Sequence, residues 1–286
     1  MYDLLTVEDV DYALLRVSFQ LGAAIMFRTF LLVGDGRTVP AEFSANVRRV
    51  AQLFHARLVL AEVRSPEQLS AATTSGAAAS EAAANPPTTD AASCEVNTVI
   101  LAGDFVQTVC DKGHEADVIV IWRGATGDAD SMPASGGLTN DELSNLVRQA
   151  PRPIWLAREP VRVPEHIVVA YDGSAHSGRA LHMGANLAET LGARLTVLNV
   201  DESRDVVAQE LILSRAAGYC EPYRISMERV GVFGPAAPSI QSYADSSQCD
   251  LLVLGAAGVG YLRGLLFGSV TGQLITHATC SVLVAK

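Results

Sequence analysis

The residues best suited to chemistry stand in a glycine-rich loop near the carboxyl end of the chain. Gly255 and Gly258 are separated by two residues, and nine further residues lead to Gly268 and Ser269. Glycine lets a backbone approach a phosphate closely and adopt angles that are closed to other residues. A helix that begins at Gly268 would direct free N–H groups at an anion, and the Ser269 hydroxyl would add one more donor. The spacing therefore predicts a phosphate site.

An aspartate earlier in the second half would stand beside this loop. Asp172 follows an apolar run, residues 166–170, of the kind that a buried parallel strand shows. In an open parallel sheet the ligand lies outside the carboxyl ends of the strands, where the strand order reverses. Asp172 therefore stands at the edge of the sheet where a ligand would lie.

Each of these residues also has a purely structural alternative. The glycines can form a tight strand-to-helix turn that binds nothing. Asp172 can form an Asx-turn or cap the following helix, and Ser269 can cap the last helix. The agreement of the four loop positions with Asp172 and with the order of elements favours ligand binding over these alternatives.

The elements that must position these residues alternate between strand and helix throughout the second half. The expected strands are residues 166–170, 194–200, 223–232, 251–254 and 281–285. The expected helices are residues 177–191, 205–218, 235–248 and 269–277. Such alternation predicts an α/β fold built on a doubly wound parallel sheet.

The first half repeats this order with weaker signals, which indicates an internal duplication. Its expected strands are residues 30–33, 57–63, 96–102, 117–121 and 153–157, and its expected helices are residues 39–55 and 140–149. We expect two tandem domains, residues 26–158 and 164–286, joined by a short proline-flanked linker. Residues 1–25 fall outside the pattern as an N-terminal extension, and the segment 65–93, rich in Ala, Ser, Thr and Pro, is expected to be a flexible loop within the first domain.

Composition excludes several classes of function. A formal net charge of −10 and a pI near 5.0 argue against nucleic-acid binding, which needs clustered Lys and Arg. The N-terminus carries acidic residues where a secretory signal would be basic, and charges interrupt the apolar stretch that follows, so neither export nor a membrane span is expected. Five scattered cysteines without a CxxC pair indicate free thiols in a reducing cytoplasmic compartment and no metal site.

The loop of the first half lacks the phosphate-binding residues. Alignment of the last helices places Asn140 and Asp141 where Gly268 and Ser269 stand. An acidic residue at that helix N-terminus would repel phosphates. Asp35 retains the aspartate after the first strand, so a base-sized ligand stays open for this half.

Three glycines of the first half do repeat the spacing of the second. Gly124, Gly127 and Gly137 follow the same intervals, but Leu138 takes the place of the serine and the register against the strand is wrong. We interpret this match as a coincidence.

With these residues in place, the chain resembles the universal stress protein family, in its ATP-binding branch. The order Gly, two residues, Gly, nine residues, Gly, Ser or Thr is the nucleotide loop of that branch, and this sequence matches it in full. The resemblance implies a Rossmann-like fold of the adenine-nucleotide α-hydrolase type. It implies that Asp172 meets the adenosine part of ATP, that the Val200 backbone reads the adenine edge, that Val270 follows the phosphate-binding serine, and that Ala170 and Tyr171 line the base pocket.

The sequence departs from the family at Ala257, where many relatives carry a larger residue that is often basic or polar. Phosphoryl transfer needs a cation at the γ-phosphate, and Arg263 is the one nearby candidate. We therefore expect ATP, with Mg²⁺ or Mn²⁺, as a regulatory ligand in stress response and at most weak hydrolysis. A scaffold that binds no nucleotide and a slow ATPase remain the alternatives.

The resemblance also implies how the two domains meet. Domains of this family pack through their last strands, so residues 154–157 and 282–285 are expected to pair within the chain. A homodimer and an unknown protein partner remain open.

Overall fold

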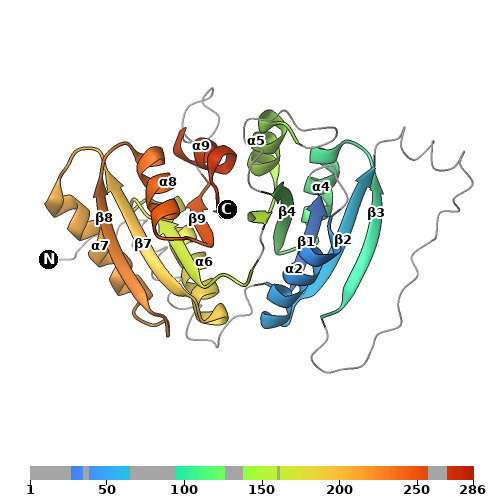
Figure 1. Ribbon diagram of the computed structural model, residues 1–286, viewed down its shortest axis with the longest axis horizontal. Helices are drawn as coiled ribbons and strands as arrows, with labels where there is room; N and C mark the ends of the chain where they lie inside the picture. The colour runs from blue at the N-terminus through green and yellow to red at the C-terminus, as the bar shows by residue number, and fades with distance from the viewer. Residues whose placement is uncertain (1–26, 35–38, 65–93, 126–137, 160–161, 257–268) are drawn as a thin grey trace, which may run out of the picture.

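The computed structural model describes residues 27–34, 39–64, 94–125, 138–159, 162–256 and 269–286. Within them ten strands form one sheet in the order β3-β2-β1-β4-β5-β10-β9-β6-β7-β8 (Figure 1). Each half contributes five strands in the same internal order, in which the first strand lies between the second and the fourth. The chain is thus two tandem doubly wound α/β units, as the sequence predicts.

The bounds of the elements follow the alternation closely. The first half comprises β1 (Thr29–Gly34), α2 (Ala41–Leu53), β2 (Arg57–Arg64), β3 (Val96–Ala102), α4 (Phe105–Gly113), β4 (Val118–Ala125), α5 (Asn140–Gln149) and β5 (Ile154–Glu159). The second half comprises β6 (His166–Ala170), α6 (Ala175–Leu191), β7 (Arg194–Asp201), α7 (Val206–Cys220), β8 (Met227–Phe233), α8 (Ala236–Ser246), β9 (Leu251–Gly255), α9 (Ser269–His277) and β10 (Ser281–Ala285). None of these described helices is long and apolar enough to cross a membrane.

The two halves are joined by their last strands. β5 and β10 pair antiparallel, with Trp155 opposite Leu283, whereas the other neighbouring strands are parallel. This confirms the pairing that the sequence predicts. Because Ile154 and Leu283 are fully buried, the junction is part of the core.

Helices cover both faces of the sheet, and each face has a core that continues across the junction. Helices α2, α6 and α7 pack on one face, and α4, α5, α8 and α9 pack on the other. Ile167 and Val169 of β6 enter the first core, while Val168 between them enters the second. Such alternation is the period of a strand, and burial on both sides explains why its sequence is continuously apolar.

Three elements differ clearly from the sequence expectations. Strand β4 continues to Ala125 and does not end at residue 121. Helix α4 is not expected from the sequence, because its nine residues carry only a short apolar signal; Asp104 caps it by accepting a hydrogen bond from the Gln107 N–H at 3.0 Å. Strand β8 begins at Met227 and not at residue 223. Tyr223 lies in a turn, where its N–H donates to the Cys220 carbonyl at 3.0 Å. Because its side chain is buried in the core, the sequence has a large apolar residue there that resembles part of a strand.

The segments 1–25 and 65–93 and the residue Asp35 lie outside the described residues, as do Gly127 and Gly137. The expectations for them stay predictions.

Two glycines of α6 give a matched test of its packing. A Cβ at Gly184 would lie 2.3 Å from Cγ2 of Val169, whereas a Cβ at Gly178 would meet nothing within 4 Å. We expect Gly184→Ala to lower the free energy of unfolding by about 1–3 kcal/mol, because it overpacks the core. Gly178→Ala should raise it by about 0.5–1 kcal/mol through helix propensity. Urea unfolding measures both, and equal effects would contradict this packing.

Candidate functional site

The second half has one point where the strand order reverses, between β6 and β9. From β6 the chain passes to β7 on one side, and β9 returns on the other side of β6. Asp172 follows β6 and Gly255 ends β9, so both lie at the carboxyl edge of neighbouring strands. Ligands of open α/β sheets bind at such a position.

Gly255 is held against the beginning of α6. A Cβ at this position would lie 2.6 Å from both the carbonyl carbon and the carbonyl oxygen of His176, so no side chain fits there without moving backbone. The Gly255 carbonyl also accepts a hydrogen bond from Oγ1 of Thr271, in the first turn of α9, at 3.2 Å. The end of β9 therefore contacts the beginning of α6 and the beginning of α9.

Asp172 is part of the cap of α6. Its carboxylate Oδ1 accepts a hydrogen bond from the Ser174 N–H at 2.9 Å, and its own N–H donates to Oγ of Ser177 at 3.3 Å. Burial raises the pKa of the Asp172 carboxyl, but hydrogen bonds from Ser177 and Ser174 outweigh it and hold the pKa below its ordinary value. The side chain is exposed and anionic at neutral pH, so it can serve as cap and as acceptor for a ligand.

Asn199 is a residue of this site that the sequence reasoning missed. It is 2% exposed on β7, and its Nδ2 donates to the carbonyl of Tyr171 at 2.7 Å. Its Oδ1 is buried and has no hydrogen-bond partner in the described part of the chain. The sequence signal that could have identified Asn199 is a single amide side chain within the mainly apolar run of residues 194–200. Asn199 ties β7 to the turn that carries Asp172, and Val200 follows it.

The remaining expected site residues lie around these three segments. Ala170 is half-buried at the end of β6, and Tyr171 is 2% exposed with its side chain in the core beneath α6 and α7. Val200 and Val270 are partly buried on the opposite face. The structure thus brings Asp172, Val200, Gly255 and the first turn of α9 to one edge. Ser269 begins α9, while Gly258, Gly268, Ala257 and Arg263 lie outside the described residues.

The corresponding edge of the first half is built differently. Asp117 and Asp250 make the same bonds before β4 and β9, and five residues later Trp122 stands where Gly255 does. The Trp122 ring lies against Phe43 of α2, with 6.0 Å between ring centroids, and its Nε1 donates to Glu159 at 3.2 Å. In the first half, large side chains therefore fill the region that the backbone of α6 occupies beside Gly255 in the second half.

The helix N-terminus in the first half is also occupied. Thr139 and Glu142 form a reciprocal capping box: the Glu142 N–H donates to Thr139 Oγ1 at 3.2 Å, and the Thr139 N–H donates to Glu142 Oε2 at 2.8 Å. Asp141 adds a second acid in this first turn. Two negative side chains already neutralise the positive end of α5.

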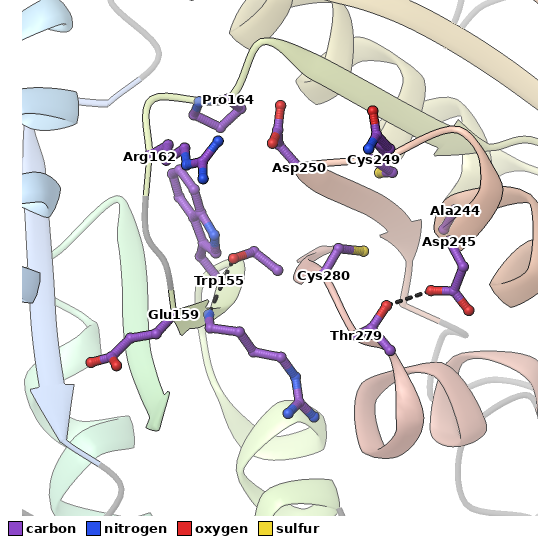
Figure 2. A pocket seen from close by; sticks show the side chains of 13 residues that line it. Trp155, Glu159, Arg162, Pro164, Ala244, Asp245, Cys249, Asp250, Thr279 and Cys280 are labelled. Atoms are coloured by element: carbon purple, nitrogen blue, oxygen red, sulfur yellow. Dashed lines mark hydrogen bonds between the residues drawn. The ribbon is translucent and has the colours of Figure 1, made fainter. Parts of the chain in front are cut away.

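A separate cavity of about 330 Å³ lies at the junction of the halves (Figure 2). Trp155 of β5 lines one side of it, and Cys249 and Cys280, which precede β9 and β10, line another. A hydrogen bond with Cys280, together with burial, raises the pKa of the Cys249 thiol. This cavity lies beside the amino ends of β6, β9 and β10, so it is distinct from the carboxyl edge that carries Asp172 and Gly255.

Comparisons with known proteins match this architecture. The model of the universal stress protein family matches residues 164–217 and 204–286. A universal stress protein of Thermus aquaticus is 32% identical over 42% of this chain and 97% of its own length. One of Synechocystis is 25% identical over 62% of this chain, but the match spans only 61% of that protein. The crystal structure of a universal stress protein from Archaeoglobus fulgidus superimposes with a TM-score of 0.66 and 15% identity, over 93% of this chain and 98% of that one.

The pKa of Asp172 yields a test of its bonding. A carboxyl whose pKa is depressed in the folded state stabilises the fold above its unfolded pKa, near 3.8, and loses this contribution as pH falls through the folded value. We expect Asp172→Asn to lower the unfolding free energy most near neutral pH and progressively less below pH 3.8.

NMR titration of the Asp172 carboxyl provides the matched measurement. Ser177→Ala, which removes a hydrogen-bonding hydroxyl, should move the midpoint upward. A midpoint at or above the ordinary value in the unaltered protein would contradict the geometry.

Proposed function

Because the chain belongs to the universal stress protein family, we propose that its second half, residues 164–286, binds ATP as a regulatory ligand. The observation that carries the proposal is the junction at Gly255. There the end of β9 contacts the beginning of α6 and is hydrogen-bonded to the first turn of α9. The glycine loop connects β9 to α9. Because β9 contacts the beginning of α6, both ends of this loop are held beside Asp172.

The geometry supports a division of the ligand between three segments. The exposed Asp172 carboxylate is ionised at neutral pH and can accept hydrogen bonds from the ribose hydroxyls. The backbone at Val200, next to the buried Asn199, would read the adenine edge. Gly268, Ser269 and Val270, at the beginning of α9, would hold the phosphates, because a helix N-terminus favours an anion.

Binding without efficient turnover fits the residues at this edge. Phosphoryl transfer relies on a Lys or an Arg, in addition to the metal ion, to neutralise charge at the γ-phosphate. The described residues at the site, 170–177, 199–200, 255–256 and 269–271, contain neither Lys nor Arg. Mg²⁺ or Mn²⁺ would accompany ATP through its phosphate oxygens.

We propose further that one chain binds one nucleotide. In the first half, residues 26–158, Trp122 and Phe43 fill the edge, and the capping box neutralises α5. The two halves would then act as a nucleotide-responsive unit and a unit that does not respond, connected rigidly through β5 and β10.

Calorimetric titration of MgATP into the full chain tests this proposal. We expect one site per chain, and Gly268→Asp should abolish it, because a carboxylate at that position would repel the phosphates. Gly137→Asp is the matched control, since it alters the glycine of similar spacing in the first half. It should leave the affinity within twofold.

Two outcomes would contradict the proposal. Absence of heat with the unaltered protein would favour the scaffold that binds no nucleotide. Two sites per chain, or loss of binding in Gly137→Asp, would place a nucleotide in the first half. Assay of released ADP or AMP on the same samples separates regulation from slow hydrolysis.

A further inference from the structure

The amino-terminal edge of the first half holds a basic cavity of about 490 Å³. It lies where β1, β2, β4 and β5 begin, at the opposite end of the strands from the carboxyl edge. Three arginines and two histidines line it: Arg28, His55, Arg57, His114 and Arg152. In a chain with a formal net charge of −10, this is a concentration of positive charge.

The two carboxylates of this cavity are already engaged. The Asp117 carboxylate accepts hydrogen bonds from the N–H groups of Arg28 and Thr29 at 2.8 and 2.9 Å. The Glu115 carboxylate pairs with the ammonium of Lys112 at 2.6 Å. Neither carboxylate forms an ion pair with an arginine of the cavity.

Within the described part of the chain, the arginine charges are therefore uncompensated. Arg57 donates through Nε to the Thr29 hydroxyl at 2.8 Å, and Arg152 reaches the His114 carbonyl only at 3.4 Å. Among the described residues no carboxylate forms an ion pair with Arg28, Arg57 or Arg152. Most of their N–H donors remain available for a ligand.

The second half supplies an internal comparison, because its backbone is bonded in the same way. The Asp250 carboxylate accepts from the N–H groups of Glu165 and His166 at 3.0 and 2.9 Å, as Asp117 does in the first half. Arg194 pairs with His166 in β6 and β7 as Arg57 pairs with Thr29 in β1 and β2. Equivalent positions can thus be identified residue by residue.

At the equivalent positions of the second half, the basic side chains are either replaced or already hydrogen-bonded. Glu165 replaces Arg28, Ser247 replaces His114, and Cys280 replaces Arg152. The one equivalent arginine, Arg194, lies 3.0 Å from His166 Nδ1 and donates to the Ser247 carbonyl at 3.3 Å. The basic cavity is therefore a property of the first half and not of the fold.

The backbone at His55 carries a second sign of specialisation. His55 has a φ of 53°, and its counterpart Gly192, which also follows a helix, has a φ of 68°. Glycine adopts this left-handed conformation freely, whereas a side chain is strained in it. The first half thus places an imidazole at the cavity in a conformation that favours glycine, one that Arg204 and Gln248 also adopt in the second half.

We propose that this cavity binds a small phosphate-type anion with two or more negative charges, for which inorganic pyrophosphate is the probe. The planar guanidinium groups match phosphate oxygens in bidentate geometry, and the volume is that of a small-ligand site. This site is independent of the nucleotide site, because the two lie at opposite ends of the strands and in different halves.

Calorimetric titration of pyrophosphate into the full chain tests the proposal. The combined variant Arg28→Gln and Arg152→Gln should weaken binding at least tenfold, since it removes two of three guanidinium groups. Arg194→Gln, at the equivalent edge of the second half, should leave the affinity within twofold. Orthophosphate should bind more weakly than pyrophosphate, and the affinity should fall as salt rises.

Two further variants keep the result interpretable. His55→Gly should raise the unfolding temperature, because it relieves the strained backbone, and weaken pyrophosphate binding several-fold. Gly268→Asp should retain pyrophosphate binding, and the arginine variant should retain ATP binding, so that failure of either proposal can be recognised separately. Loss of pyrophosphate binding in Gly268→Asp, an equal effect of Arg194→Gln, or no binding at millimolar pyrophosphate would overturn the inference.

Discussion

The two carboxylates of Asp117 and Asp250 fix the register on which the rest of the structure depends. Each accepts two backbone N–H groups at the beginning of the first strand of its half, and so holds that strand beside the fourth. A charge-assisted pair of such bonds is stronger than a neutral one. The strand order reverses at this pair of strands, so the same register sets both the amino edge and the carboxyl edge.

The two halves place different chemistry on this shared frame. In the second half Gly255 lets backbone approach backbone, and the carboxyl edge stays open beside Asp172. In the first half Trp122 fills that edge, while Arg28 and Arg152 gather at the amino edge. Because β5 and β10 join both halves in one sheet, ligands at the two edges would bind to a single rigid body.

The sequence predicts those features that depend on neighbouring residues. Strands β6 and β10 and helix α9 have the expected bounds because their apolar patterns are uninterrupted. The cap of α6 around Asp172 is equally local. The hydrogen bond from Asn199 to the Tyr171 carbonyl joins residues that are 28 positions apart in the sequence. The cavity around Arg28 brings together residues that are more than 100 positions apart, so spacing alone cannot find either feature. Helix α4 is missed because its pattern is too short.

Photoaffinity labelling with an azidoadenine analogue of ATP, followed by peptide mapping, would show which residues surround the adenine. We expect the label to enter peptides that contain residues 170–177 or 199–205 of the second half, and we expect excess ATP to prevent this labelling. Label confined to peptides of the first half, or label that ATP does not displace, would contradict it.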